Sequence, residues 1–384
     1  MSIPFNKPYV GPDALEHIRI ALQSGHLSGD GPYTKKCHLW LEQATGCSKA
    51  LLTHSCTGAL EMAAMLLRLE PGDEVIMPSF TFVSTANAFV LRGAVPVFVD
   101  IRPDTLNIDE TLIEAAITSR TKAICVVHYA GVACEMDAIM EIADRHGLAV
   151  VEDAAQGANA SYKGAPLGSI GHLGTLSFHE TKNIVSGEGG ALLINRADLV
   201  ERAEIIREKG TDRSKFFRGQ VDKYTWVDIG SSYLPSDLNA ALLYSQLAEM
   251  DAITQRRMQL WTRFHNALEP YEVSGLIRRP TIPEGIKHNA HLYYILLPAP
   301  ELRDQFIATL RTEGVGSVFH YVPLHSSPAG QRYTRVAGYM SRTEDLSSRL
   351  VRLPMWPDLD QRDDMEIALN ACRIALDQLD RQVG

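Results

Sequence analysis

The stretch EVIMPSFTFVSTANAFVLRGAVPVFVD, residues 74–100, contains the pattern that decides the fold. An apolar run at 74–78 is followed by a helical pattern at 83–93 and by a second apolar run at 96–100. Strands that alternate with helices of this length form right-handed β–α–β units, and their strands pair in parallel. Both runs are nearly continuous in apolar residues, as expected for strands that are buried on both faces. The stretch therefore predicts an α/β fold with a mainly parallel sheet.

The same alternation extends to both sides of this stretch. Further strands are predicted at 49–53, 123–129, 148–153, 175–179 and 190–195. Further helices are predicted at 58–69, 109–117, 136–147 and 199–210. A strongly helical stretch then leads to a remainder with strands at 291–298 and 316–322 and helices at 301–314 and 361–380. We expect a large domain of residues 1–245 and a small C-terminal α+β domain of residues 246–384.

Composition excludes several classes of function. The 384 residues include 46 Asp and Glu against 37 Lys and Arg, so the formal charge is −9. An acidic chain without a basic run is a poor candidate for general binding to nucleic acid or to a membrane surface. The N-terminal stretch has no apolar core of signal-peptide length, and no apolar run approaches the ~20 residues that span a bilayer. Six cysteines without a CxxC pair agree with a reducing compartment. We expect a soluble, cytoplasmic protein.

Two pairs of residues invite a metal interpretation, His128 with Cys134 and His288 with His291. Zinc sites usually show paired ligands at tight spacing, so His128 and Cys134 are better interpreted as a partly buried histidine and a core cysteine. The pair His288 and His291 lacks a Glu or a third ligand nearby. We therefore predict no metal.

A turn of small polar residues lies between the strand at 49–53 and the helix at 58–69. The N–H groups at a helix N-terminus, with the hydroxyls of Ser55 and Thr57 beside them, form an anion site. Ordinary helix capping by Ser or Thr is the alternative.

Asp153 and Lys182 are two charged residues close to the ends of predicted strands. Asp153 ends a buried strand, where a carboxylate is expensive unless it is paired. Its partner could be a helix N-terminus, a structural ion pair or a cationic cofactor nitrogen. Lys182 follows the strand that contains Ser177 and precedes the turn GEGG at 187–190. Such a lysine is either a solvated loop residue or the amine that binds a carbonyl cofactor.

The three features together match what pyridoxal 5'-phosphate (PLP) requires. The phosphate needs hydrogen-bond donors, the pyridine nitrogen needs an acid that keeps it protonated, and the aldehyde needs a lysine. The GxxxxGK[ST] loop is absent and GEGG does not follow a strand as a dinucleotide loop does, which disfavours ATP and nicotinamide. We predict PLP as the cofactor.

Several longer motifs are similar to the DegT/StrS-type, PLP-dependent nucleotide-sugar aminotransferases of the aspartate-aminotransferase (type I) fold. They are PGDEVIMPSFTFVSTANAF, VEDAAQ, SFHETKN, GEGGA, AEIIREKG and FHYVPLH, and they cover nearly the whole chain. HYAGVACEMD, AEIIREKGT and FFRGQVDKYTW resemble the dTDP-4-amino-4,6-dideoxygalactose transaminase (WecE-type) branch of this family.

The resemblance implies a role for each matching residue. Lys182 matches the lysine that binds the cofactor aldehyde and moves the proton, and Asp153 matches the carboxylate on the pyridinium nitrogen. Gln156 matches the residue near the phenolic oxygen of the cofactor. Cys56, Thr57 and Ser177 match the phosphate site. Phe82 matches the aromatic residue that stacks on the ring, although it could equally be a core residue.

The substrate pocket and the subunit contact also have matching positions. His320, Tyr321 and His325 in FHYVPLH match the lining of the sugar-nucleotide pocket. Family members often carry GYNxR, whose Asn reaches the cofactor phosphate of the neighbouring subunit. Here the segment reads GSSYL, so Ser232 replaces the Asn and Leu234 replaces the Arg. A serine is shorter but can still donate a hydrogen bond.

The activity implied by the resemblance is transfer of the amino group of L-glutamate to C4 of dTDP-4-keto-6-deoxy-D-glucose. The products would be 2-oxoglutarate and dTDP-4-amino-4,6-dideoxy-D-galactose, a precursor of a surface polysaccharide such as enterobacterial common antigen. The resemblance also implies a homodimer with shared active sites. Two alternatives remain: a transaminase of another keto-sugar (3-keto or UDP-linked), and a PLP-binding regulator without turnover. The presence of Lys182, Asp153 and Gln156 argues against the regulator.

Overall fold

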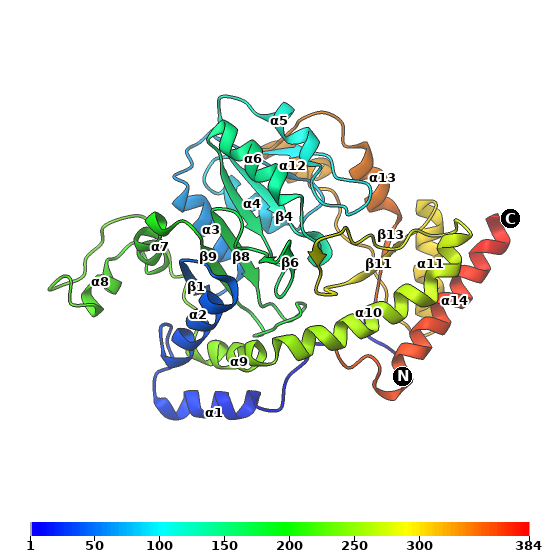
Figure 1. The fold of residues 1–384 in the computed structure, drawn as a ribbon, viewed down its shortest axis with the longest axis horizontal. Coiled ribbons are helices and arrows are strands. Elements are labelled where there is room, and N and C mark those ends of the chain that lie inside the picture. Colours follow the sequence, from blue (N-terminus) through cyan, green and yellow to red (C-terminus); the bar gives the residue numbers. More distant parts are fainter. Residues whose placement is uncertain (1, 384) are drawn as a thin grey trace.

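The computed structural model describes residues 2–383. Within that range, the centre of the molecule is an eight-stranded sheet with the order β1-β9-β8-β5-β4-β2-β3-β12 (Figure 1). Its strands are β1 (Lys49–Thr53), β2 (Glu74–Pro78), β3 (Val95–Val99), β4 (Thr121–Val127), β5 (Ala149–Asp153), β8 (Leu173–Ser177), β9 (Gly190–Ile194) and β12 (Arg335–Val336). Strand β9 is antiparallel to both of its neighbours, and every other pair in the sheet is parallel. The predicted α/β class with a mainly parallel sheet is confirmed.

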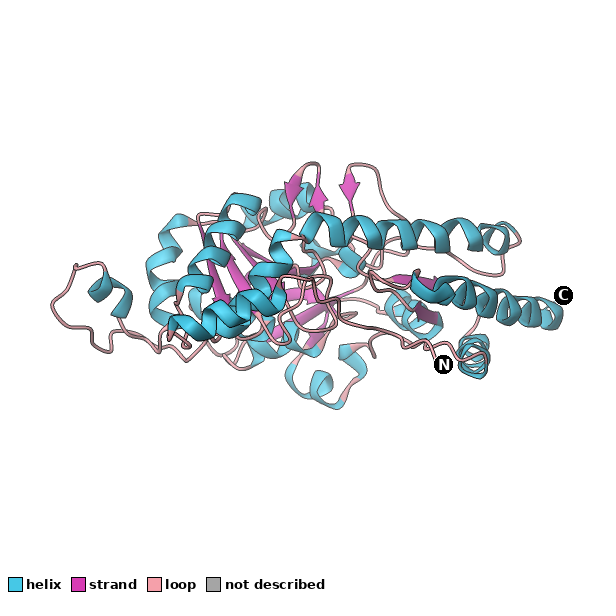
Figure 2. Ribbon diagram, turned by 90° about the horizontal axis from the view of Figure 1, so that it is seen from below, coloured by secondary structure: helices cyan, strands magenta, loops and turns pink. Residues whose placement is uncertain are grey.

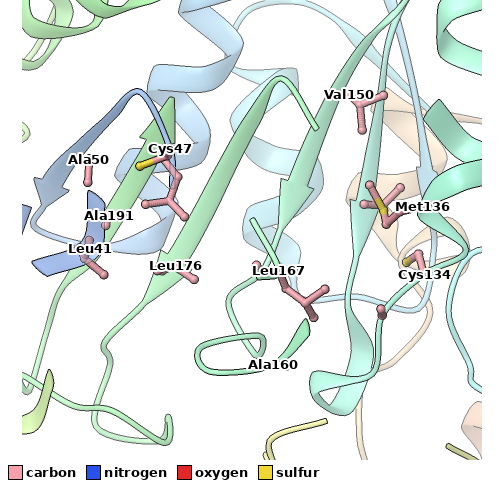
Figure 3. Close-up of a cluster of buried hydrophobic side chains, with 14 of the residues drawn as sticks. Leu41, Cys47, Ala50, Cys134, Met136, Val150, Ala160, Leu167, Leu176 and Ala191 are labelled. Carbon is pink, nitrogen blue, oxygen red and sulfur yellow. The ribbon is translucent and has the colours of Figure 1, made fainter. Parts of the chain in front are cut away.

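Helices cover both faces of this sheet (Figures 1 and 2). One set is α1 (Ala14–Ser24), α2 (Pro32–Thr45), α5 (Ile113–Ala116), α6 (Met136–His146) and α9 (Asp237–Ala248). The other is α3 (Cys56–Leu66), α4 (Val83–Val90) and α7 (Val200–Arg207). Successive strand residues point to opposite faces. Accordingly, Ile76 of β2 packs in the first layer, whereas Val75 and Met77 pack in the second. Figure 3 shows part of the first layer, where Leu41 of α2 and Met136 of α6 lie in one cluster with strand residues such as Val150.

The C-terminal part has a separate core. It contains the long helix α10 (Met250–Val273), strands β11 (Tyr293–Leu296) and β13 (Leu350–Leu353), and helices α11 (Pro300–Thr312) and α14 (Asp364–Val383). Helix α10 runs from the large part into the small part (Figure 1). Several segments cross the predicted boundary at residue 245: Ile3 packs in the C-terminal core, β10 pairs with β6, and β12 joins the central sheet beside β3. The two-domain division itself stays a prediction.

The remaining elements are short. They are β6 (Ser161–Tyr162), β7 (Ala165–Pro166) and β10 (Ile286–Lys287), which form a small sheet, and α8 (Arg213–Phe217), α12 (Pro328–Tyr333) and α13 (Ser341–Arg349). Among the residues described, none of the helices has the length and apolarity that a bilayer crossing demands.

Most predicted elements agree with the structure, and one is wrong. The strands at 49–53 and 74–78 have the predicted bounds, and the helix at 109–117 is a 3-10 turn (Glu110–Leu112) followed by α5. The predicted strand at 316–322 does not form, since only Val318 makes an isolated bridge, to Arg352. The backbone leaves the extended conformation at Tyr321, which has a φ of +26°. Residues 318–321 of this segment line a cavity instead, and their largely apolar composition is the same as that of a buried strand.

Candidate active site

A cavity of about 710 Å³ lies where the carboxyl ends of the central strands meet the C-terminal part. Ligands bind at this edge in open α/β sheets, because the loops that leave parallel strands converge there. Nine of the predicted site residues line the cavity: Cys56, Thr57, Phe82, Asp153, Gln156, Ser177, Lys182, His320 and Tyr321. Two others, His325 and Ser232, do not.

The N-terminus of α3 forms one wall of the cavity. Ser55 caps the helix, and its hydroxyl accepts a hydrogen bond from the N–H of Gly58 at 3.0 Å. The hydroxyls of Thr57 and Ser84 lie 2.8 Å apart. A Cβ at Gly190 of β9 would collide with the backbone of this turn, so the glycine allows the close approach of strand and helix. Free helical N–H groups and hydroxyls together suit a phosphate.

Asp153 is a buried carboxylate that only neutral groups contact. The hydroxyl of Thr85 donates to Oδ2 at 2.7 Å, and the N–H of Ala155 donates to Oδ1 at 3.1 Å. Among residues 2–383 it forms no ion pair. Burial raises its pKa, and the hydrogen bonds from Thr85 and Ala155 and the charge of Lys182 offset that effect only in part. Asp153 therefore neither caps a helix nor belongs to a structural ion pair within the described residues. Its carboxylate suits a cationic atom of a ligand.

Lys182 lies in the loop between β8 and β9 and faces the same cavity. Burial lowers the pKa of its amine, while the thiol of Cys56 and the carboxylate of Asp153 act in the opposite direction. A lysine in these surroundings carries a larger fraction of free amine than an exposed lysine does. It can therefore act as a nucleophile or a base, and it is not a solvated loop residue.

Gln156 and Tyr321 connect the two parts of the molecule across the cavity. The amide of Gln156 donates to the hydroxyl of Tyr321 at 2.9 Å and accepts from the N–H of Ala130 at 2.7 Å. Tyr321 stacks on His320, with ring centroids 3.6 Å apart. The ring of His320 in turn contacts the hydroxyl of Tyr129 at 2.8 Å. This chain of contacts orients the polar groups of the pocket.

Phe82 is 58% exposed, although it precedes a buried helix. Its ring lies 6.4 Å from that of Tyr321. A core role is thereby ruled out for this residue, because a core phenylalanine would be covered. An aromatic ring at a cavity wall can instead stack on a planar ligand.

His325 faces away from the cavity. Its Nδ1 lies 2.8 Å from the hydroxyl of Ser79, and its Nε2 lies 3.2 Å from Glu344. Ser79 is fully buried, so this serine–histidine–acid row has no access to a substrate. The row attaches the FHYVPLH segment to the end of β2. The predicted substrate contact of His325 is therefore not supported by its position.

Ser232 is exposed, and its backbone bridges to Glu208. It lies outside the cavity of its own chain. Its predicted contact is with a neighbouring subunit, so that role stays a prediction.

The residues considered for a metal have protein partners. His128 is fully buried, with Nε2 2.9 Å from Glu152, while its Nδ1 accepts from the N–H of Cys134. Nδ1 of His288 accepts from the N–H of Ala290, and Nδ1 of His291 contacts Asn183. These histidines therefore stabilise the fold through protein contacts, and His291 also lines the cavity.

Sequence reasoning missed polar groups in and beside the cavity. Thr85, whose hydroxyl donates to Asp153, lies inside a predicted helix and outside the cavity lining. His291 and Arg352 line the cavity and lie in the distant C-terminal part. No local pattern distinguishes them from surface residues. The one available signal was that parallel strands place the loops after their carboxyl ends at the same edge of the sheet.

The cavity fits PLP. The hydroxyls and N–H groups at the start of α3, with Ser177, would hold the phosphate. Asp153, buried without an ion-pair partner, would hold the protonated ring nitrogen. Lys182 would bind the aldehyde, and Phe82 is free to cover the ring.

Comparisons with known proteins agree with this fit. The model of the DegT/DnrJ/EryC1/StrS aminotransferase family matches residues 8–370. The spore coat polysaccharide biosynthesis protein SpsC of Bacillus subtilis is 34% identical over 382 residues, which cover 97% of this chain and 96% of SpsC. The structure of the aminotransferase TlmJ from Streptoalloteichus hindustanus is similar with a TM-score of 0.90 and 30% identity, over 99% of this chain and 100% of TlmJ. The PLP form of Spr1654 from Streptococcus pneumoniae matches with a TM-score of 0.89 and 25% identity, over 99% of this chain and 100% of Spr1654. The predicted enzyme class, cofactor and type I fold are confirmed.

Proposed function

The chain belongs to the DegT/DnrJ/EryC1/StrS aminotransferase family of PLP-dependent transaminases, and from this premise we propose that it aminates C4 of dTDP-4-keto-6-deoxy-D-glucose. The amino donor is L-glutamate. The products are 2-oxoglutarate and dTDP-4-amino-4,6-dideoxy-D-galactose. The observation that carries transamination is the pair Lys182 and Asp153: an amine with a lowered pKa and a buried carboxylate that forms no ion pair within residues 2–383 line one cavity.

Three residues of the chain have separate roles in the proposed reaction. PLP, when bound, supplies an electron sink for the negative charge that develops at the reacting carbon. Asp153 keeps the ring nitrogen protonated, which the sink requires. The free amine of Lys182 takes the proton from the α-carbon of the donor, and in the second half of the reaction it delivers a proton to C4 of the sugar. Gln156 holds Tyr321 at the cavity wall through their 2.9 Å hydrogen bond.

The choice of sugar is supported by sequence segments that resemble the WecE-type branch. HYAGVACEMD (128–137) contributes Tyr129, which contacts His320 at the cavity wall. FHYVPLH (319–325), which is similar to the family as a whole, contributes His320 and Tyr321 to the cavity. These neutral polar groups suit the hydroxyls of a deoxysugar.

We also propose a homodimer. Figure 1 shows α8 on an arm that extends away from the sheet. The arm exposes large aromatic side chains: Phe217 is 70% exposed, Tyr224 52% and Trp226 78%. Exposed apolar groups gathered on one segment indicate a protein interface. Ser232 follows this arm, which supports its contact with the phosphate site of the second copy.

The product is a precursor of surface polysaccharide such as enterobacterial common antigen, and the reaction takes place in the cytoplasm. The relative SpsC, whose name refers to spore coat polysaccharide biosynthesis, supports the assignment to polysaccharide biosynthesis.

A two-stage absorbance experiment on the PLP-loaded protein tests the proposal. L-Glutamate is added until the visible absorbance of the bound PLP is lost, and the excess is then removed. Addition of dTDP-4-keto-6-deoxyglucose should restore the absorbance, and mass spectrometry should detect the aminated sugar nucleotide. A 3-keto sugar nucleotide and a UDP-linked 4-keto sugar serve as competing acceptors.

Each outcome separates the alternatives. Loss of absorbance without recovery would retain a transaminase and exclude this sugar. Recovery with only a competing acceptor would assign that sugar instead. If glutamate and other amino donors leave the absorbance unchanged, the protein is a PLP-binding regulator.

A further inference from the structure

The segment HNAH (288–291) of the C-terminal part forms a tight turn beside the cavity. Arg257 of α10 is buried, and its Nε and Nη2 donate to the carbonyls of Ala290 and His291 at 3.0 and 2.6 Å. Ala290 has a φ of +51°, which is uncommon for a residue with a side chain. The two hydrogen bonds from one guanidinium stabilise this turn and fix the backbone of His291.

The same segment contacts the loops that carry Gln156 and Lys182. The side-chain amide of Asn289 donates to the carbonyl of Gln156 at 2.8 Å. The side-chain amide of Asn183 donates to the carbonyl of Asn289 at 2.9 Å, and Asn183 directly follows Lys182 in the chain. A segment of the C-terminal part therefore holds two cavity loops of the central sheet in place.

The ring of His291 is oriented by Asn183. Its Nδ1 lies 3.0 Å from Oδ1 of Asn183. The amide nitrogen of Asn183 already donates to Asn289, so its oxygen faces His291 and Nδ1 carries the proton. Burial lowers the pKa of His291 well below its ordinary value, and the charges of Lys182 and Arg257 lower it further, so the ring is neutral. Nε2 is then a bare acceptor, and it forms no hydrogen bond with residues 2–383.

We propose that His291 is a positioning residue for Lys182 and acts through its hydrogen bond to Asn183. The inference rests on the proposed transaminase function and extends it, because it assigns the placement of the base to the C-terminal part. The amine of Lys182 first binds the aldehyde of PLP and then takes the proton of the donor, so its backbone has to stay in one place for both steps. A hydrogen bond to the neighbouring side chain prevents a shift.

Direct contact between His291 and a substrate is the alternative, because the side chain lines the cavity and Nε2 is without a partner in the described chain. Two substitutions separate the roles of the ring nitrogens. Asparagine retains a donor near the position of Nδ1 and removes Nε2. Glutamine places its polar end near the position of Nε2 and removes the donor close to the backbone.

Visible circular dichroism of the PLP-loaded protein tests the inference without turnover. The signal of bound PLP depends on how rigidly the ring and the attached lysine are oriented. His291→Phe keeps a ring but removes the donor, so the signal per bound PLP should weaken. His291→Asn should restore most of the signal, and His291→Gln should not. Asn183→Ala removes the acceptor and should give the same loss as His291→Phe.

Single-turnover kinetics with L-glutamate measure the placement of the base. In His291→Phe, the loss of PLP absorbance at saturating glutamate should be about 10- to 100-fold slower, at an unchanged half-saturating concentration. Deuterium at the α-carbon of glutamate should slow this variant more than the unmodified enzyme, because proton transfer has become the slow step. The double variant with Asn183→Ala should be no slower than the slower single variant, since both changes remove one hydrogen bond.

His288→Phe is the matched control. His288 belongs to the same segment but packs on Trp261 outside the cavity, with ring centroids 4.7 Å apart. The substitution should leave the circular dichroism and the isotope effect unchanged. Melting curves establish that the variants fold, and Asn183→Ala provides the test if His291→Phe does not.

Three results would overturn the inference. Equal losses in His288→Phe and His291→Phe would mean that the segment only stabilises the fold. Recovery with His291→Gln but not with His291→Asn would assign Nε2 to a substrate contact. A normal signal and rate in Asn183→Ala would remove the connection to Lys182. If glutamate does not react with the unmodified enzyme, the proposed function fails, and the circular dichroism still decides the role of His291.

Discussion

Glu74 and Asp153 are buried carboxylates at opposite ends of the same parallel sheet. Glu74 begins β2, is fully buried, and accepts hydrogen bonds from Arg335 at 2.8 and 2.7 Å and from Arg120 at 2.8 Å. The bonds from Arg335 are the main reason that the pKa of Glu74 falls to about 2. Asp153 ends β5, and its hydrogen-bond donors within residues 2–383 are the neutral groups of Thr85 and Ala155, so burial raises its pKa.

The difference teaches how to separate a structural charge from a functional one. Burial penalises a charge unless a partner of opposite sign is present. At the amino end of the sheet the chain supplies that partner itself. At the carboxyl end, neither Asp153 nor, across the cavity, Arg352 forms an ion pair within residues 2–383. Ligands can supply the missing partners there, and the following changes test that division.

Lys182→Ala should have the largest effect on the cavity side. Transamination should fall by roughly 10⁴-fold, because both the nucleophile and the base are lost. The melting temperature should stay within a few degrees, since a half-buried amine contributes little to packing. Product formation measured by mass spectrometry checks the rate. The exposed Lys163, changed to alanine, is the control, and a wild-type rate in the Lys182 variant would contradict the assignment.

Asp153→Asn should lower kcat by about 10²- to 10³-fold, because a neutral amide does not hold the ring nitrogen protonated. The free energy of unfolding of the PLP-free protein should stay equal or rise, because the amide avoids the burial of a charge. Rate and urea denaturation are measured on the same preparation. A large loss of stability would mean that Asp153 is structural, and the comparison with Glu74 would fail.

Glu74→Gln should show the opposite pattern. The free energy of unfolding should fall by about 2 kcal/mol, because the charge-assisted bonds from Arg335 and Arg120 are weakened. The kcat should be unchanged, since Glu74 does not line the cavity. Urea denaturation measures the loss, and the exposed Glu313 changed to Gln provides the baseline. A fall in kcat at full stability would break the distinction between the two ends of the sheet.

The pH dependence of stability should also differ between the two carboxylates. The folded pKa of Glu74, about 2, is below its ordinary value of 4.5, so its contribution is complete above pH 4.5 and is lost as pH falls towards 2. Asp153 has a raised pKa, so its ionisation destabilises the fold as pH rises through that pKa. Urea titrations of the PLP-free protein at several pH values should show a smaller acid loss for Glu74→Gln than for the unmodified chain. If the free energy of unfolding fell equally with pH in both proteins, the ion pairs of Glu74 would not explain the loss of stability in acid.

Ser232→Ala should have the smallest effect. If its hydroxyl contacts the phosphate site of the second subunit, the Kd for PLP should rise by about 3- to 10-fold. Fluorescence titration of the PLP-free protein measures it, with Ser231→Ala as the neighbouring control. Equal affinities of the two variants would remove Ser232 from the cofactor site.

The local elements and the reacting groups were predictable from sequence. Strand β2 has the predicted bounds because its apolar run is short and flanked by turn residues. Asp153 and Lys182 were identified because strand ends of a parallel sheet share one edge, which local periodicity reveals. The segment 316–322 was assigned wrongly because an apolar cavity wall and a buried strand share the same composition.

By itself, the sequence determined the α/β class, PLP as the cofactor, and the pair Lys182 and Asp153, because each depends on residue type and short-range spacing. Only the tertiary structure decided that Arg352 lines the cavity, that Thr85 donates to Asp153, that His325 contacts Ser79, and that Phe82 is uncovered. The direction of a side chain and its distant neighbours follow from the packing of segments far apart in the chain. That packing also decided which buried charges found a partner within the protein and which were left for a ligand.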